Sequence, residues 1–295
     1  MKKRIYAISA FCVLTFMLAI GMLVSCEHLE LSKKSAAESV SGNLHVSVFQ
    51  IEQTPFGSVT RTAASEACTR LNFLVYDESG SRIKTVNQTS SDNSFGTASF
   101  QLEEGNYQLV VVGHSASGNP TSTDPHQIKF TNATGFTDTF LYSEEITIGQ
   151  DQLDLQVSLK RIVALCRFVI NDDYPSGVAK MQFYYTGGSG AFDAYTGFGC
   201  VKSKQTVIFD VSDGQRQFDL YTFMHELSGD ISLTVTALDA SENELSQRKF
   251  DVPMEQNHIT WLSGDFFSGS GSSSSTTVSE VTVNIDWAGE IFKTF

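Results

Sequence analysis

The sequence predicts an all-β protein built from two tandem β-sandwiches. Short segments in which apolar and polar residues alternate recur along the chain, as in residues 231–237, where Ile, Leu, Val and Ala alternate with Ser and Thr. This period of two is typical of half-buried strands. Turn-forming clusters such as Asp77–Gly80 separate the segments. Since no helical periodicity extends beyond a turn or two, the pattern indicates an all-β chain.

The N-terminus has the plan of a secretory signal peptide. Three basic residues, Lys2, Lys3 and Arg4, precede an apolar run over residues 5–24, which ends at Ser25 and Cys26. A basic start, an apolar middle and a small-residue end predict removal of residues 1–25. The sequence Leu-Val-Ser-Cys looks like the lipobox of bacterial lipoproteins, which implies that Cys26 is acylated and becomes the first residue. The alternative is an uncleaved membrane helix, because about 20 apolar residues can span a bilayer.

The residues after Cys26 refine the predicted location. Glu27 and Glu30 follow the cysteine closely, and acidic residues at this place resemble the surface-exported lipoproteins of the Bacteroidetes. Two or more acyl chains anchor a protein stably. We therefore expect a lipid-anchored protein on the outer face of the outer membrane.

The mature chain is long enough for two domains. Removing residues 1–25 leaves 270 of the 295 residues, which at about 150 residues per domain fits two domains or one large all-β unit. We expect a polar tether over residues 26–42, a first sandwich over 43–160 and a second over 161–295.

The first predicted sandwich begins with an irregular strand. Leu44, Val46 and Val48 alternate, and the apolar parity then shifts to Phe49 and Ile51, which predicts a β-bulge near Val48. A polar connection over residues 53–67 follows, with a short helical turn expected from Ala63 to Cys68. The later strands are expected within 71–75, 83–86, 98–102, 107–112 as a central strand, 127–130 and 140–148.

The domain boundary is predicted from a change of parity. Apolar residues occupy odd positions from Leu153 to Leu159 and even positions from Ile162 to Ile170. A one-residue slip swaps the buried face of a strand, so either a bulge lies here or the chain leaves one core and enters another. We prefer the second interpretation and place the boundary near Lys160, because about 110 residues of strand pattern lie on each side, a typical domain size.

The second predicted sandwich ends in a strand for which the sequence allows two pairing partners. Strands are expected at 181–185, 207–211, 218–224, 231–237 and 259–261. A Ser/Gly/Thr linker over 268–277 precedes Val281, Val283, Ile285 and Trp287, which alternate with polar residues. Ten such residues reach roughly 16–19 Å. The strand either completes its own sheet or is donated to a neighbouring subunit.

Composition and motifs exclude several functions. The net charge is −13, and −16 after loss of residues 1–25, which disfavours nucleic acid. Cys68, Cys166 and Cys200 remain, enough for one disulfide at most, and the sequence does not say which pair would form it. His225–Glu226 begins like a zinc-protease motif, but the second histidine is replaced by Gly229. We expect no catalytic set, no metal and no cofactor.

Several segments, taken in order, resemble one known family. The chain is similar to the fimbrillin-A-associated anchor and minor-subunit lipoproteins of the Bacteroidales, which belong to type V fimbriae. The resemblance covers nearly the whole mature chain and rests on Cys26 and on residues 103–111, 157–164, 181–188 and 257–267. It implies two transthyretin-like β-sandwiches, surface exposure, and a role in pilus assembly and cell adhesion with other fimbrial subunits as partners. It implies no enzyme.

The resemblance also suggests one processing site. Stalk subunits of this family are cut by an arginine-specific protease after the first strand, and Arg61 and Arg70 lie near that position. An anchor would instead keep its first strand. The alternative to a fimbrial role is a surface lipoprotein that captures a glycan or a host protein through loops such as 115–126 and 186–200.

The Cys26→Ala variant tests the lipobox. Without the thiol no acyl chain can be attached. We therefore expect the variant to stay unprocessed or to be absent from the membrane fraction, because the acyl chains supply the membrane affinity. Immunoblots of fractionated cells report both outcomes. A mature-size band that stays with the membrane would contradict the assignment of Cys26.

Overall fold

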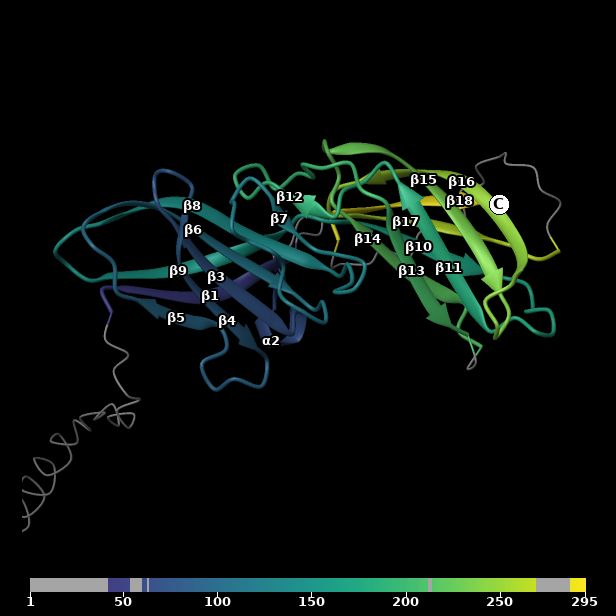
Figure 1. Cartoon of the computed structure of the whole chain (residues 1–295), viewed down its shortest axis with the longest axis horizontal. Helices are drawn as coiled ribbons and strands as arrows, with labels where there is room; N and C mark the ends of the chain where they lie inside the picture. Colours follow the sequence, from purple (N-terminus) through teal and green to yellow (C-terminus); the bar gives the residue numbers. More distant parts are fainter. Residues whose placement is uncertain (1–41, 54–59, 63, 212–213, 269–286) are drawn as a thin grey trace, which may run out of the picture. The chain divides into compact units, whose positions relative to one another are not determined.

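A computed structural model describes residues 42–53, 60–62, 64–211, 214–268 and 287–295 (Figure 1). The prediction of an all-β chain is confirmed. The predicted helical turn is present as α2 (Ala64–Ala67). No helix within the described ranges is both long and apolar enough to cross a membrane. The signal peptide, the tether and Cys26 lie outside the described residues.

One large sheet forms the first half of the described chain. Its strands follow the order β2-β1-β9-β8-β6-β3-β4, with β5 also paired to β1. The strands are β1 (Leu44–Gln53), β2 (Thr60–Thr62), β3 (Arg70–Tyr76), β4 (Arg82–Thr89), β5 (Thr97–Phe100), β6 (Gly105–His114), β8 (Thr139–Ile148) and β9 (Leu153–Arg161). As predicted, residues 107–112 lie in a central strand, since β6 pairs with β3 on one side and β8 on the other.

This sheet folds over on itself at β8 and β9. The two strands pair only through Phe140 with Arg161 and Leu141 with Lys160, so the strands on either side of this short contact form two layers. Leu44, Val157 and other side chains from the β1–β9 layer pack against Phe73, Val111 and other side chains from the β3–β6 layer in one buried cluster. The folded sheet is therefore a sandwich with a shared corner.

The predicted bulge is present in β1. The register between β1 and β9 shifts between Val48 and Gln50. Phe49 is the extra residue and is 56% exposed, whereas Ile51 beyond it is fully buried. Although both residues follow the parity change, only Ile51 therefore lies on the buried face, because a bulge inserts one extra residue and locally disrupts the alternation of the strand.

The second half contains two four-stranded sheets packed face to face. One has the order β14-β10-β17-β18 and the other β13-β11-β15-β16. Their bounds are β10 (Ala164–Ile170), β11 (Lys180–Thr186), β13 (Gln205–Asp210), β14 (Gln217–Thr222), β15 (Ser228–Leu238), β16 (Glu244–Glu255), β17 (His258–Gly264) and β18 (Gly289–Thr294). Aromatic rings fill the space between them: Phe183 lies 5.4 Å from Phe168 and 5.0 Å from Phe218 between ring centroids.

A short ribbon and a shared cluster link the two halves. β7 (Ile128–Lys129) pairs with β12 (Ala191–Phe192). A third apolar cluster combines Val110 and Val112 of β6 with Phe223, Ile259 and Trp287. The chain changes sheets between β9 and β10, where the parity changes, but residues 41–295 form one compact unit. The domain boundary near Lys160 therefore stays a prediction.

A buried histidine closes the end of β6. His114 Nδ1 accepts a hydrogen bond from the Ala116 amide at 3.2 Å, and its Nε2 lies 2.9 Å from Asn72 Oδ1. Phe130 packs edge-on against the ring at 5.0 Å. Burial, together with the positive charge of Arg70, lowers the pKa of His114 to about 4.

Stability should fall on mild acidification because of His114. An unfolded histidine has a pKa near 6.5. Between that pH and pH 4, His114 is protonated in the unfolded chain but stays neutral in the folded protein. The contribution is present above pH 6.5 and is lost as the pH falls toward 4, by roughly 3 kcal/mol at most. Urea unfolding at pH 7 and at pH 4.5 measures it, and His114→Gln should flatten the difference.

His126→Gln is the matched control for that measurement. His126 is exposed and bonds Asp193 at 2.9 Å, and this hydrogen bond raises its pKa. A raised pKa stabilises the fold at low pH and loses that effect as the pH rises, so the control should change the pH dependence in the opposite sense. If the unfolding free energy of His114→Gln fell between pH 7 and pH 4.5 as much as that of the unaltered protein, His114 would not be the cause of the pH dependence.

Candidate functional site

The connection between β9 and β10 is the point where the chain leaves one set of sheets and enters the next. Its first side chain, Arg161, ends β9 and is only 2% exposed. A buried guanidinium group is costly unless charged and hydrogen-bonding partners surround it. The partners of Arg161 come from three distant parts of the chain.

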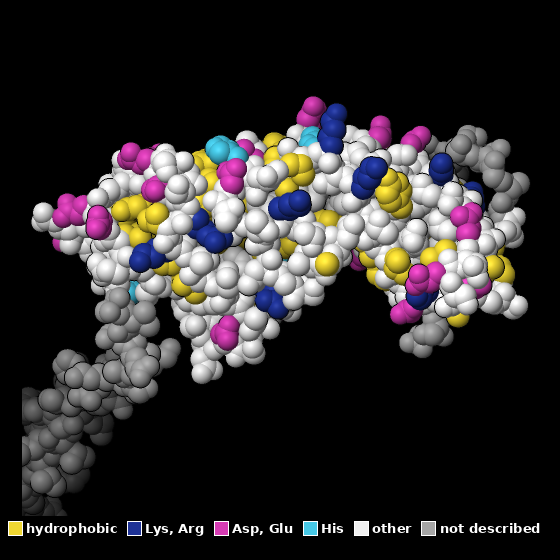
Figure 2. All heavy atoms as spheres, viewed as in Figure 1, with side chains coloured by type: hydrophobic (Ala, Val, Ile, Leu, Met, Phe, Trp, Pro, Cys, Tyr) yellow, Lys and Arg dark blue, Asp and Glu magenta, His cyan; other side chains and the backbone are white. Residues whose placement is uncertain are grey.

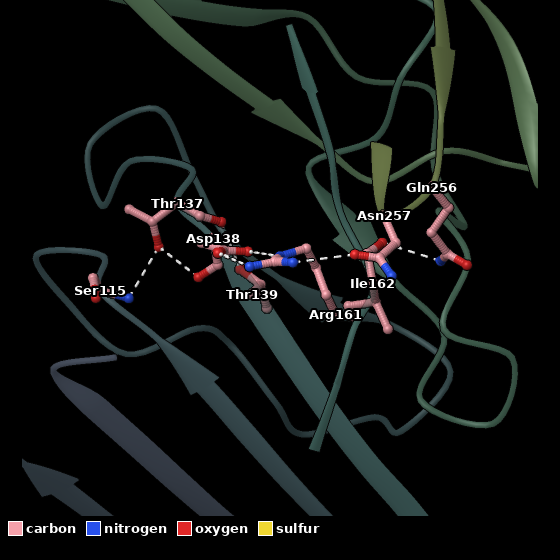
Figure 3. Close-up of polar contacts among 8 residues, drawn as sticks. All are labelled: Ser115, Thr137, Asp138, Thr139, Arg161, Ile162, Gln256 and Asn257. Atoms are coloured by element: carbon pink, nitrogen blue, oxygen red, sulfur yellow. Dashed lines mark hydrogen bonds and ion pairs between the residues drawn. The ribbon is translucent and has the colours of Figure 1, made fainter. Parts of the chain in front are cut away.

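Asp138 supplies the charge. Arg161 Nε and Nη2 donate to the two carboxylate oxygens of Asp138 at 2.7 and 2.8 Å, and Figure 3 shows the two planar groups facing each other. Such a two-point pair fixes geometry as well as charge. Thr137 and Thr139 order the turn around Asp138, because Thr137 Oγ1 accepts from the Ser115 amide at 3.0 Å and Thr139 Oγ1 donates to the Thr137 carbonyl at 2.8 Å.

The hairpin between β16 and β17 supplies the next contact. Asn257 has a positive φ of 60°, a conformation that asparagine tolerates better than most residues. Arg161 Nη1 donates to Asn257 Oδ1 at 3.2 Å, and Gln256 Nε2 donates to the Ile162 carbonyl at 3.1 Å (Figure 3). The Asn257 amide donates to the Val163 carbonyl at 2.8 Å. The hairpin is thereby attached to the connection by both side chains and backbone.

Two aromatic rings cover the faces of the guanidinium group. The Arg161 Cζ lies 4.0 Å from the ring centre of Trp287 and 5.0 Å from that of Phe140. Trp287 is 6% exposed. Cation–π contacts of this kind strengthen when they are shielded from water. Arg161 therefore holds the start of the C-terminal segment as well as the hairpin, and we call Asp138, Phe140, Arg161, Asn257 and Trp287 the arginine clamp.

From the clamp, the C-terminal segment runs along an open sheet edge. The Ala288 amide donates to the Asn257 carbonyl at 2.8 Å, and β18 then pairs in parallel with β17. At the end of the chain the Phe295 ring stacks on Phe168 at 5.0 Å. A Cβ at Gly264 would overlap the Phe295 carbonyl, so only glycine allows this approach. The segment is thus anchored at both ends, and β18 is the last strand in the order of this sheet among the described residues.

A cavity of about 620 Å³ opens beside the clamp, with mixed lining from both halves of the described chain. Glu52 and Glu144 bring carboxylates, Lys160 an amine, and Tyr195 and Leu227 partly exposed apolar surface. The opposing charges define no single ligand class. Within the described residues, no group of three or more His, Cys, Asp and Glu side chains is arranged to hold a metal ion.

The structure reaches only part of the predicted terminal strand. Val281, Val283 and Ile285 lie outside the described residues, and the described strand β18 begins at Gly289, beyond the predicted segment. Trp287, the last residue of the predicted set, is buried in the clamp and not presented at the surface. The donation of this segment to another subunit stays a prediction.

Arg61 and Arg70 lie in strands, whereas the sequence placed both in a polar connection. Arg61 is the middle residue of β2 and pairs with Glu52 of β1. Arg70 begins β3, where its guanidinium group donates to the Ser117 carbonyl at 3.0 Å. The composition of 53–67 gave little indication of a three-residue edge strand. Cleavage after Arg61 stays a prediction.

The three described cysteines are free thiols. Burial raises the pKa of both Cys68 and Cys166 to about 12, so neither thiol is reactive at neutral pH. Cys166 is a small core residue, as its apolar surroundings in the sequence predicted. Asp138, Arg161 and Asn257 were not predicted as site residues, because Asp138 and Asn257 lie far from Arg161 in the chain and leave no local signal.

Comparison with known proteins gives one family match. The sequence model of the family described as fimbrillin-A associated anchor proteins Mfa1 and Mfa2 matches residues 40–288. Among proteins of curated function, none matches this sequence.

Several solved structures are similar to the chain at low identity. A proposed adhesin from Bacteroides ovatus is 16% identical with a TM-score of 0.46, and the alignment covers 63% of this chain and 77% of that one. The fimbrial anchor protein Mfa2 from Porphyromonas gingivalis is 12% identical with a TM-score of 0.39, covering 70% and 80%. A fimbrial assembly protein from Parabacteroides distasonis is 13% identical with a TM-score of 0.36, covering 75% and 89%.

Arg161→Met should destabilise the protein and release Trp287. The change leaves Asp138 without its cation and removes the charge from the Trp287 face, and because Asp138 is partly exposed we expect a loss of about 2–4 kcal/mol. Urea unfolding measures the loss. The chain has two tryptophans, and emission from Trp287 should shift to the red.

Arg167→Met is the matched control for the clamp. Arg167 forms the same two-point pair with Asp219, at 2.7 Å for both contacts, and lies 4.9 Å from the Trp261 ring. It should alter Trp261 emission and leave the Trp287 signal in place. Equal spectra and equal unfolding free energies for Arg161→Met and the unaltered protein would contradict the clamp.

Proposed function

The chain belongs to the family of fimbrillin-A associated anchor proteins, and from this premise we propose that it is a lipid-anchored anchor or minor subunit of fimbriae at the outer-membrane surface. The observation that carries the proposal is the family match, which spans residues 40–288 and so includes almost every described strand. The family consists of fimbrial anchor proteins and not of enzymes. Pilus assembly and adhesion are the processes in which such a protein takes part.

The predicted lipid supplies attachment to the membrane. Acyl chains on Cys26 would hold the chain by its N-terminus, and β1 begins soon afterwards at Leu44. β1 lies within its sheet, paired in parallel with β9 and in antiparallel with β5 and β2. The lipid tether therefore leads directly into an internal strand.

An anchor role requires β1 to stay in place. Leu44, Val46 and Ile51 of this strand are buried at 0–2% exposure, so losing it after cleavage at Arg61 would uncover one layer of the first core. In an anchor the bond after Arg61 stays intact, and the mature protein begins at Cys26. A stalk subunit would instead begin at Thr62, which mass spectrometry of surface protein would detect.

The second contact of an anchor is with another fimbrial subunit. We assign it to the segment containing Val281, Val283 and Ile285, because its alternating apolar residues suit addition to a sheet edge. Trp287 and Phe295 are used inside the chain, at the clamp and over Phe168. The proposed donor residues are thus Val281, Val283 and Ile285, which precede Trp287 in the chain.

A triple variant, Val281→Ser, Val283→Ser and Ile285→Ser, tests this assignment. It removes the apolar side chains and keeps Trp287 and β18, so we expect unchanged unfolding free energy and fimbriae that detach from the cells. Electron microscopy and blots of the medium report attachment. Fimbrial subunits should co-purify with the tagged unaltered protein but not with the tagged triple variant.

Deletion of residues 287–295 is the paired control. It removes Trp287 and Phe295 from their clusters and should cost about 3 kcal/mol or more. A similar fall in the triple variant would show that Val281, Val283 and Ile285 belong to the chain's own core, and the donor assignment would then be dropped. Failure of tagged protein to recover any fimbrial subunit would contradict the fimbrial role itself.

A further inference from the structure

A basic hollow of about 410 Å³ lies beside the β7–β12 ribbon. Lys129 comes from β7, and Lys202 and Lys204 come from the segment before β13; all three are exposed. None of the residues that line the hollow is acidic, and among the described residues no ion pair joins these lysines to a carboxylate. In a chain with 33 acidic and 20 basic residues, three unpaired lysines around one hollow are a local reversal of charge.

The wall of the hollow is held in place by hydrogen bonds. The Phe130 amide donates to the Gly190 carbonyl at 2.9 Å, and the Gly190 amide donates to Ser203 Oγ at 2.8 Å. Asn132 Oδ1 accepts from the Thr206 amide at 3.1 Å. These contacts join the loop after β7 to the segment carrying Lys202 and Lys204, so the backbone beneath the lysines is ordered before any ligand arrives.

The lining combines charge with apolar and hydrogen-bonding groups. The half-buried Phe136 contributes aromatic surface, and Gln127, Thr131 and Asn132 contribute amide and hydroxyl groups. A sugar ring presents apolar C–H faces and hydroxyl groups, which these groups complement, and a small number of placed polar groups is typical of ligand sites. The amines of Lys129, Lys202 and Lys204 favour a ligand that carries negative charge.

We propose that this hollow binds an acidic polysaccharide, a chain of sugars that carries carboxylate or sulfate groups. A nucleic acid duplex fits poorly, because it carries one charge per about 1.7 Å whereas the hollow supplies three amines. A folded acidic partner would need about 800 Å² of matching surface, whereas this site is a small hollow. Figure 2 shows acidic and basic side chains interspersed over the displayed face.

The test is binding of the full chain, purified in detergent, to dextran sulfate and to polygalacturonate, with neutral dextran as the reference. Biolayer interferometry should show binding to at least one of the two anionic polymers, none to dextran, and weakening as salt rises. The two polymers distinguish sulfate from carboxylate as the recognised group.

Three variants locate the site. Lys129→Gln, Lys202→Gln and Lys204→Gln together should weaken binding roughly ten-fold or more, since each contributes an exposed charge contact. The same three positions changed to Arg should keep the affinity. Lys84→Gln, Lys160→Gln and Lys249→Gln change the net charge equally at exposed positions elsewhere, and should leave the affinity within about two-fold.

Several results would overturn the proposal. Equal losses in the two Gln triple variants would mean that net charge and not the hollow controls binding. Equal affinity for double-stranded DNA and for the anionic polysaccharide would identify an unselective basic patch, and no binding to either polysaccharide would remove the site altogether. The fimbrial role is tested separately, because these variants keep Cys26 and the C-terminal segment.

Discussion

The buried charge of Arg161 is the constraint on which the joining of the two halves depends. An isolated guanidinium group cannot remain inside a protein without partners, so Asp138, Asn257 and two aromatic rings must all be present when the chain reaches its folded state. Because Asp138 lies just before β8, Asn257 in the β16–β17 hairpin and Trp287 in the C-terminal segment, satisfying one cation brings three distant parts of the chain to the same place. Apolar packing alone would bring the same parts together with less control over their orientation.

The clamp also explains how a parallel edge strand is kept in register. Among the described strands β18 pairs only with β17, and this pairing alone specifies its position weakly. Trp287 fixes one end beside Arg161, and Phe295 fixes the other over Phe168 and Phe250. Glycines at 264 and 289 give room at the two ends, since a Cβ at Gly289 would overlap the His258 ring. Side chains at the ends thus determine the alignment of the strand between them.

The sequence allowed much of the fold to be predicted because many strands bury one face. The alternation at 231–237 marks β15, and the slip after Val48 marks a real bulge. β18 went unrecognised because residues along it are half-buried without alternation, so its residues carry no period of two. The clamp was not predicted, since Asp138 and Asn257 lie 23 and 96 positions from Arg161 in the sequence. The basic hollow combines Lys202 and Lys204, which are close in sequence, with Lys129 of strand β7, and no local pattern reveals this combination.

The position of β1 has a mechanical consequence. A pull on a lipid-linked N-terminus would act along β1, which is bonded to β9 on one side and to β5 and β2 on the other. Force along an internal strand loads many backbone hydrogen bonds at once, in shear, whereas force at the end of an edge strand breaks them one at a time. A tether that enters the fold through β1 is therefore placed where the sheet best resists extraction, and drag on a structure attached to this protein would be spread over the hydrogen bonds of a whole strand.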